Sequence, residues 1–142
     1  MSGFLLDTCA ISEFAKPRPN AGLVRWLGST DPLNVFLSTI TLGELYYGIA
    51  LVADRTKRTG LERWLRDDVL ADFAGRILDV DTNVADRWGK LRAASRRAAK
   101  ALSPIDGLIA ATGIQHGLAV VTRNEDDFRA TGAALVNPWA ES

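Results

Sequence analysis

The sequence predicts an α/β fold: a three-layer α/β/α sandwich around a central, mostly parallel sheet of four to five strands. Short apolar runs suited to buried strands occur at residues 4–6, 33–37, 76–80, 118–122 and 134–136. Apolar residues recur at helical spacing between most of these runs, and strands that alternate with helices favour parallel crossovers. The 142 residues suffice for one core, so we expect a single domain over residues 1–142.

Capping residues and apolar spacing together place the expected helices. A short helix at residues 8–15 stops before Pro17, and a second begins at Asn20 and ends at Gly28. Further helices are expected at residues 39–50, at residues 61–69, from residue 82, and at residues 104–116. The polar residues 54–60 are expected to form a linker between the third and fourth helices.

The composition limits the classes of function. The formal net charge is zero, which argues against a general attraction to polyanions but allows local basic patches. Cys9 is the single cysteine, so an internal disulfide is impossible and a cytosolic protein is indicated. No apolar run approaches the roughly 20 residues that span a bilayer. We therefore expect a soluble, cytoplasmic protein without a membrane partner.

Four acidic residues stand where this fold would bring them together: Asp7, Glu44, Asp106 and Asp127. Ligands of parallel sheets bind beyond the carboxyl ends of strands, which is where Asp7 and Asp127 follow their strands. Glu44 and Asp106 lie early in helices that should face the same edge. Converging carboxylates repel one another unless a cation lies between them, and such oxygen ligands suit Mg²⁺ or Mn²⁺. Taken singly, each acid is also compatible with a helix cap or a solvated surface position.

Three segments of the chain, taken in order, are LLDTCAISEF, STITLGELYYGI and SPIDGLIAATGIQHGLAVVTRNEDDF. In these segments the chain resembles the PIN-domain ribonucleases, and most closely the VapC and FitB type toxins, in which the same motifs occur in the same order. The likeness extends over nearly the whole chain. The resemblance implies a PIN-like form of the expected fold. It further implies a metal-dependent endoribonuclease toxin, which hydrolyses RNA phosphodiester bonds with metal-activated water. A homodimer and a cognate VapB- or FitA-like antitoxin are implied as well.

The resemblance also assigns roles to residues of the site. Asp7, Glu44, Asp106 and the acid before Phe128 are implied to be the catalytic metal ligands. Alignment to that aromatic residue favours Asp127, with Asp126 as the alternative. The residues implied to support the site by hydrogen bonding are Thr8, Thr122 and Asn124. Cys9 stands where the family commonly has Asn, and a thiol is a weaker hydrogen-bonding group than an amide.

Basic residues supply candidates for RNA contact. Arg92, Arg96 and Lys100 recur every four residues and form a stripe that could follow a phosphate backbone. Arg123 lies closer to the acids and either holds the scissile strand or pairs with Asp126. The same residues are equally compatible with solvated helix faces.

Two other functions compete with the nuclease. The first is a catalytically weak or dead PIN-fold module that binds RNA or protein. The second is a phosphoacceptor domain of the receiver type. The lone acid at Asp7 and the lack of a Lys near Val136 argue against the receiver.

Overall fold

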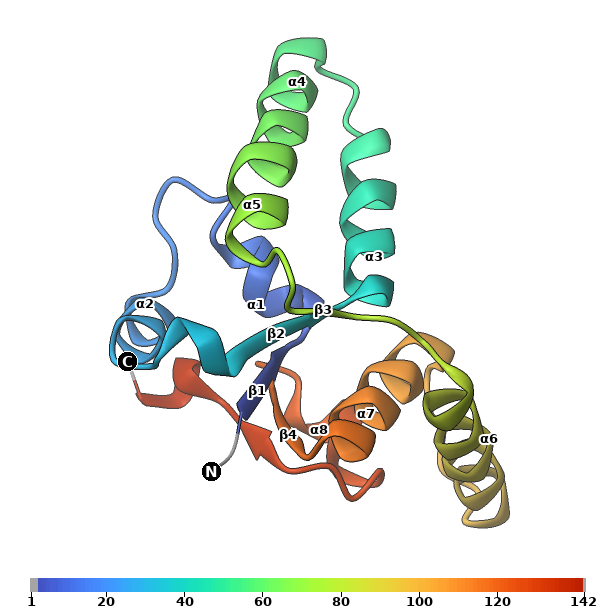
Figure 1. Ribbon diagram of the computed structural model, residues 1–142. Coiled ribbons are helices and arrows are strands. Elements are labelled where there is room, and N and C mark those ends of the chain that lie inside the picture. Colours follow the sequence, from blue (N-terminus) through green and yellow to red (C-terminus); the bar gives the residue numbers. More distant parts are fainter. Residues whose placement is uncertain (1–2, 142) are drawn as a thin grey trace.

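A five-stranded parallel sheet forms the centre of the protein in the computed structural model, which describes residues 3–141 (Figure 1). The strands are β1 (Gly3–Leu6), β2 (Val35–Ser38), β3 (Ile77–Leu78), β4 (Leu118–Val121) and β5 (Leu135–Val136). Their order is β3-β2-β1-β4-β5, and every adjacent pair is parallel. The predicted parallel α/β fold is therefore confirmed. Because the order reverses between β1 and β4, the carboxyl ends of these two strands border the expected ligand site.

Helices cover both faces of the sheet. They are α1 (Thr8–Glu13), α2 (Ala21–Gly28), α3 (Thr39–Ala50), α4 (Arg55–Trp64), α5 (Leu70–Asp72), α6 (Thr82–Arg97), α7 (Pro104–His116) and α8 (Glu125–Arg129). Two 3₁₀ turns, η1 (Pro32–Asn34) and η3 (Pro138–Glu141), and a π-helical turn, η2 (Leu65–Val69), complete the chain. In Figure 1, α3 and α4 stand side by side and project from one end of the sheet. No helix within residues 3–141 has both the length and the apolarity needed to cross a bilayer.

Local capping explains two of the expected element boundaries that are wrong; the strand expected at residues 76–80 is also shorter, at Ile77–Leu78. Residue 33 is not in a strand, because Asp31 accepts a hydrogen bond from Leu33 N and starts the turn η1, so β2 begins only at Val35. Residues 54–60 are not a linker, because the Asp54 side chain caps α4 through Thr56 N. The first six residues of α4, residues 55–60, include no apolar side chain, so apolar spacing could not mark its start.

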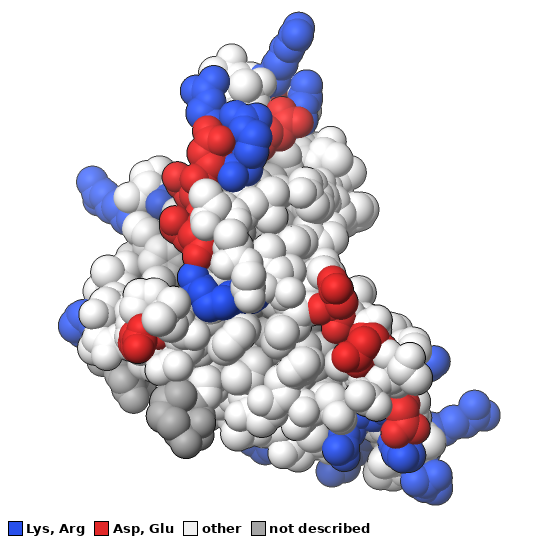
Figure 2. All heavy atoms as spheres, in the orientation of Figure 1, with Lys and Arg blue, Asp and Glu red and all other residues white. Residues whose placement is uncertain are grey.

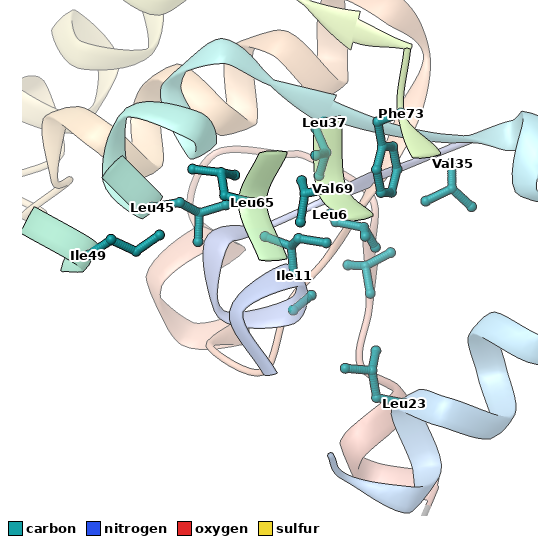
Figure 3. Close-up of a cluster of buried hydrophobic side chains, with 12 residues drawn as sticks. Leu6, Ile11, Leu23, Val35, Leu37, Leu45, Ile49, Leu65, Val69 and Phe73 are labelled. Atoms are coloured by element: carbon teal, nitrogen blue, oxygen red, sulfur yellow. The ribbon is translucent and has the colours of Figure 1, made fainter. Parts of the chain in front are cut away.

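The core lies in two clusters, one on each face of the sheet. Alternation along a strand sends neighbouring side chains to opposite faces. Leu6 accordingly packs with α1, α2 and η2, in the cluster drawn in Figure 3. Leu5 packs instead with Ile109 of α7 and Phe128 of α8. The central strand is thus anchored from both sides, and Asp7, which follows it directly, is held at a fixed position.

Gly113 allows α7 to lie directly against β4. A Cβ atom at this position would stand 3.0 Å from Val120 Cγ2 and 3.1 Å from the Leu118 carbonyl oxygen. Because a backbone atom cannot move aside as a flexible side chain can, only glycine fits here without a shift of the helix. This close approach fixes where α7 lies against β4, and with it the position of Asp106 in the first turn of α7.

Candidate metal centre

Asp7 is a buried acid of the site that is held by several hydrogen bonds. It is 5% exposed, its backbone N–H donates to the Val121 carbonyl at 2.9 Å, and it caps α1. Its carboxylate accepts from Thr8 N at 2.8 Å and from the Thr122 hydroxyl at 2.8 Å. Burial raises the pKa of Asp7, and these hydrogen bonds oppose that rise by favouring the charged form. The carboxylate is therefore oriented at the carboxyl end of β1.

Thr8 joins Asp7 to Glu44. Its hydroxyl donates a short hydrogen bond to Glu44 Oε1 and lies 3.4 Å from the hydroxyl of the buried Thr41. Helix α3 starts at the end of β2, where the Ser38 hydroxyl accepts from Ile40 N, and this start directs Glu44 toward α1. One residue thus holds two carboxylates, through its amide and its hydroxyl. The sequence did not indicate the part played by Thr41.

The negative charges of the other three acids act on Asp106. It lies in the first turn of α7, where Ser103 is the N-cap. Burial, followed by the charges of Asp7, Asp127 and Glu44, raises the pKa of Asp106 to about 6. The charges of all four acids that the sequence selects therefore meet at this edge of the sheet: Asp7 directly follows β1, and the other three lie on α3, α7 and α8. We call Asp7, Glu44, Asp106 and Asp127 the acidic quartet.

The structure distinguishes Asp127 from Asp126. Asp127 N donates to the Asn124 carbonyl at 3.1 Å, and its charge raises the pKa of both Asp7 and Asp106. The side chain of Asp126 is 90% exposed and forms an ion pair with Arg129 at 2.6 Å. These placements support Asp127 as the fourth acid. They also show that the partner of Asp126 is Arg129 and not Arg123.

The supporting residues are arranged around Thr122. This side chain is fully buried, and its hydroxyl donates to Asp7 and accepts from Asn124 N at 2.9 Å. Asn124 is the N-cap of α8 but makes no capping bond with its side chain, so its contribution comes through the backbone. Cys9 Sγ donates to Asp7 Oδ2 at 3.5 Å and lies 3.6 Å from the Thr122 hydroxyl. The thiol therefore occupies a supporting position, with a weaker bond than an amide would provide.

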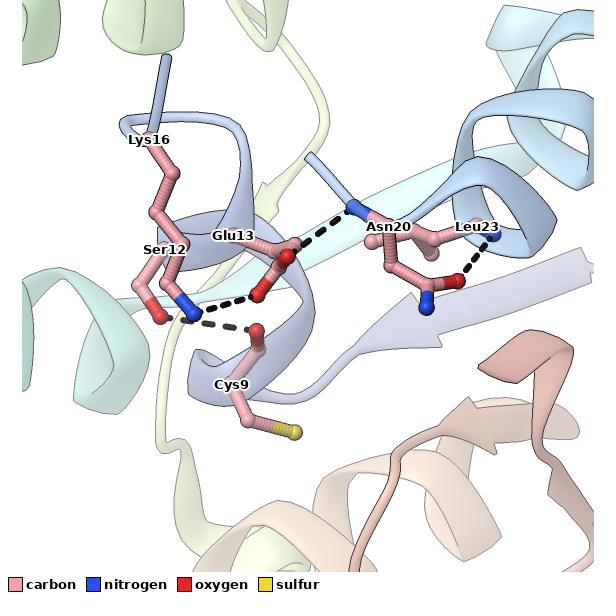
Figure 4. Close-up of polar contacts among 6 residues, drawn as sticks. All are labelled: Cys9, Ser12, Glu13, Lys16, Asn20 and Leu23. Atoms are coloured by element: carbon pink, nitrogen blue, oxygen red, sulfur yellow. Dashed lines mark hydrogen bonds and ion pairs between the residues drawn. The ribbon is translucent and has the colours of Figure 1, made fainter. Parts of the chain in front are cut away.

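Glu13 is a buried carboxylate near the site that the sequence did not reveal. Figure 4 shows it between Lys16 and Asn20, with the Cys9 thiol directed away from this group. It pairs with Lys16 Nζ at 2.9 Å and accepts from Asn20 N at 2.9 Å. The bond from Lys16 is the main cause that lowers the pKa of Glu13. The group ties α1 to the start of α2 and has no contact with the quartet that would make it a ligand.

The basic candidates lie in two places. Arg123 follows Thr122, is exposed, and has its guanidinium 5.7 Å from the centre of the Trp139 ring. Arg92 and Arg96 lie toward the C-terminal end of α6, and Lys100 follows in the loop to α7. Within the described residues, none of these four cations has an ion pair with the quartet.

The chemistry of the quartet fits a hard divalent cation. All four side chains offer carboxylate oxygens, the ligand type that Mg²⁺ and Mn²⁺ prefer. Burial is the main cause of the raised pKa of Asp106, and the negative charges of the other three acids add to it; a cation would relieve that second part. Among residues 3–141, however, no group of three or more His, Cys, Asp or Glu side chains converges closely enough to form a ready ligand set. The charges of the four acids act on one another, but within the described residues their side chains do not lie close enough to share one ion.

Comparison with known proteins identifies the family. A family model described as PIN domain matches residues 4–134. The chain therefore belongs to the PIN-domain family. It is 42% identical over 135 residues to Toxin FitB of Neisseria gonorrhoeae, and the matched region covers 95% of this chain and 97% of that protein. It is also 35% identical over 135 residues to the VapC ribonuclease Y4jK of Sinorhizobium fredii, covering 95% of this chain and 96% of the relative.

Solved structures show the same fold. The crystal structure of FitAcB from Neisseria gonorrhoeae superposes with a TM-score of 0.91 at 42% identity, over 96% of this chain and 98% of that one. A chain of a toxin–antitoxin complex from Klebsiella pneumoniae superposes with a TM-score of 0.72 at 25% identity, over 96% of this chain and 98% of that one. The expected PIN-like fold is thus confirmed.

Proposed function

We propose that this protein is a metal-dependent endoribonuclease that acts as the toxin of a toxin–antitoxin pair. The observation that carries the proposal is the placement of four carboxylates at the carboxyl edge of a parallel sheet, one directly after β1 and three on separate helices, with charges that act on Asp106. Similarity to a VapC ribonuclease and to Toxin FitB supports RNA as the substrate and toxicity as the role.

We propose the quartet as the ligands of Mg²⁺ or Mn²⁺. A divalent ion bound there supplies positive charge beside the scissile phosphate and lowers the pKa of a coordinated water. The chain's own part is to orient the ligands. Thr122 and Thr8 N fix Asp7, and the Thr8 hydroxyl fixes Glu44. Pre-oriented ligands of this kind reduce the reorganisation needed when an ion binds.

The experiment that tests this proposal compares acids that differ only in position. Asp7→Asn and Asp127→Asn are expected to abolish cleavage of total RNA in buffer with Mn²⁺. Asp126→Asn is the matched control and should keep near wild-type activity, because that side chain is exposed and paired with Arg129. Thermal melting monitored by circular dichroism confirms that each variant folds. Full activity of Asp7→Asn in Mn²⁺ would overturn the proposal.

A partner surface is available on α3. Tyr46, Tyr47 and Leu51 are 53%, 69% and 66% exposed, and a hollow of about 520 Å³ beside them is lined by Ile49 and Leu65. Contiguous apolar side chains of this kind typically mark protein interaction sites. We propose that an antitoxin of the VapB or FitA type, or a second copy of the chain in a homodimer, covers this surface. Light scattering on the purified chain, alone and with the antitoxin, measures both assemblies.

The alternative of a catalytically dead binding module predicts a different result. Such a module would retain RNA or partner binding but show no heat of Mn²⁺ binding by calorimetry. The weak Cys9 bond to Asp7 is the observation that favours it. Cys9→Asn separates the two functions, because a gain in Mn²⁺ affinity from a stronger donor requires a working metal site.

A further inference from the structure

A basic hollow lies outside the acidic quartet, at the C-terminal end of α6. It has a volume of about 450 Å³, and its lining includes Arg92, Arg96 and Lys100. Figure 2 shows Lys and Arg side chains gathered around that end of the molecule, at the lower right. Within residues 3–141, none of the three cations forms an ion pair with a carboxylate. On the same helix Lys90 is already neutralised by Asp86, at 3.0 Å. Arg92 has its guanidinium carbon 4.9 Å from the centre of the Trp88 ring, a contact that leaves its charge without a carboxylate partner among the described residues. The charge around the hollow is therefore available to an anion.

The loop after α6 holds the third cation in place. Ala99 has a φ of 54°, a left-handed conformation that non-glycine residues seldom adopt. The chain reverses there, so that Lys100 N donates to the Ser95 carbonyl at 3.0 Å and the Ser95 hydroxyl donates to the Lys100 carbonyl. These two bonds fasten the Lys100 backbone to α6, beside the arginines. A cation whose backbone is already fixed loses less conformational entropy when it binds a phosphate.

A second, mainly apolar hollow adjoins the basic one. Its volume is about 220 Å³, and it shares Ser95, Lys100 and Leu102 with the first. The other lining residues are Leu91, Ala94, Ala98, Ala130 and Thr131. An apolar space beside a cluster of cations matches the two halves of a nucleotide, since a base prefers an apolar contact and a phosphate prefers cations.

The two hollows are linked to the first turn of α7 through Leu102. Leu102 lines both of them. A Cβ at Gly107 would meet Leu102 Cδ2 at 3.3 Å, and Gly107 follows Asp106 directly. Leu102 thus lies between the hollows and the turn of α7 that carries Asp106.

We infer that the two hollows form one nucleotide-binding subsite for single-stranded RNA. A backbone phosphate binds Arg92, Arg96 and Lys100, and an unstacked base enters the apolar hollow beside Leu102. The subsite holds the strand at a distance from the bond to be cut and so sets its register on the quartet. That last role rests on the proposed nuclease function, whereas the binding does not.

The phosphate half is tested by anisotropy of a fluorescein-labelled 12-nucleotide RNA of mixed sequence, in EDTA and in an Asp7→Asn background. Arg96→Gln with Lys100→Gln is expected to weaken binding about tenfold at low salt. Because each lost phosphate contact to a single strand removes about 0.7 from the slope of log K against log salt, the slope should fall by about 1.4. The matched control is Arg87→Gln with Arg97→Gln, which removes the same charge from exposed positions of α6 that line neither hollow.

The base half is tested by Ala94→Phe, which fills the apolar hollow from an exposed position. This variant should bind the RNA severalfold more weakly with an unchanged salt slope, because no phosphate contact is lost. A 12-nucleotide RNA that carries 4-thiouridine should crosslink to the peptide of residues 91–102 in the otherwise unaltered Asp7→Asn protein, which keeps the test open if Ala94→Phe fails to fold.

Four results would overturn the inference: no RNA binding by the parent protein, equal losses in the control and test doubles, no loss in the test double, or crosslinks confined to other peptides. An Ala94→Phe protein that folds and binds RNA as the parent does would refute the base half. Failure of the proposed nuclease function is recognised separately. In that case RNA binding and its salt slope behave as described, but Asp7→Asn leaves cleavage intact in Mn²⁺.

Discussion

Thr122→Val is the most informative single change at the site, because it removes one hydroxyl and keeps the shape of the side chain. The hydroxyl is fully buried and connects two groups: it donates to Asp7 Oδ2 at 2.8 Å and accepts from Asn124 N at 2.9 Å. Valine can replace neither bond. Asp7 would keep its bonds from Thr8 N and Cys9 Sγ, but the second of these is weak.

The expected cost follows from the two lost bonds. A hydrogen bond to a charged group contributes about 1.5–3 kcal/mol, and one between neutral groups about 0.5–1.5 kcal/mol. We therefore expect Thr122→Val to lower the free energy of unfolding by about 2–4 kcal/mol at neutral pH. Because the lost bond is among those that lower the pKa of Asp7, the difference from wild type should shrink on acidification, as Asp7 takes up its proton. Loss of such an orienting partner should also weaken Mn²⁺ binding about tenfold.

Urea unfolding in EDTA, with calorimetric Mn²⁺ titration, measures both effects. Thr112→Val is the matched control, because Thr112 is also fully buried but bonds only to the neutral Leu108 carbonyl of its own helix, at 2.7 Å. It should cost about 1 kcal/mol and leave Mn²⁺ affinity unchanged. The reasoning is refuted if Thr122→Val costs no more than Thr112→Val, or if both bind Mn²⁺ equally well.

Three further predictions concern the pH dependence of stability, the packing of α7 and the buried Glu13. The pKa of Asp106 is raised to about 6, so the folded state binds more protons than the unfolded state between about pH 4 and pH 6, and stability falls as pH rises through that window. Asp106→Asn should therefore raise the free energy of unfolding of the metal-free protein at pH 7.5 by about 1–2 kcal/mol, a value reduced because the side chain is partly exposed. The same variant should lose RNA cleavage. A urea midpoint in EDTA that is lower than that of the wild type would contradict the predicted stabilisation. Gly113→Ala should destabilise the protein by about 1–2 kcal/mol, because the added Cβ meets atoms of β4. Gly89→Ala should instead stabilise it by up to about 1 kcal/mol, because a Cβ there has no neighbouring atom within 4 Å. Equal urea midpoints for the two variants would exclude the packing argument. Glu13→Gln should cost about 1–3 kcal/mol at pH 7. Because the pKa of Glu13 is lowered, this difference should shrink as pH falls below the ordinary glutamate pKa; a difference in urea that does not change with pH would show that the charge is not its cause.

Much of the fold could be predicted because it depends on local pattern. Asn20, Asp81 and Ser103 cap the helices that follow them, and Gly117 ends α7 with a φ of 67°. Each of these signals acts within a few residues. The start of α4 was missed because its first six residues, 55–60, are polar or glycine and give no apolar periodicity to detect.

The sequence by itself determined the residue types at the site and the strands that they follow. Parallel strands end at one edge, so the convergence of Asp7 and Asp127 could be argued before any coordinates were known. Only the tertiary structure decided how each acid is held. The Thr8 bond to Glu44 joins residues 36 positions apart, and the Thr122 bond to Asp7 joins residues 115 apart. It also placed the charge of Asp127 where it raises the pKa of Asp7 and Asp106, whereas the Asp126 side chain pairs with Arg129, because adjacent helical residues point about 100° apart and only the fold orients the helix. Local interactions can be predicted because they join residues within a short segment of the sequence. The pKa of a carboxylate depends instead on burial and on charges distant in sequence, which only folding brings close.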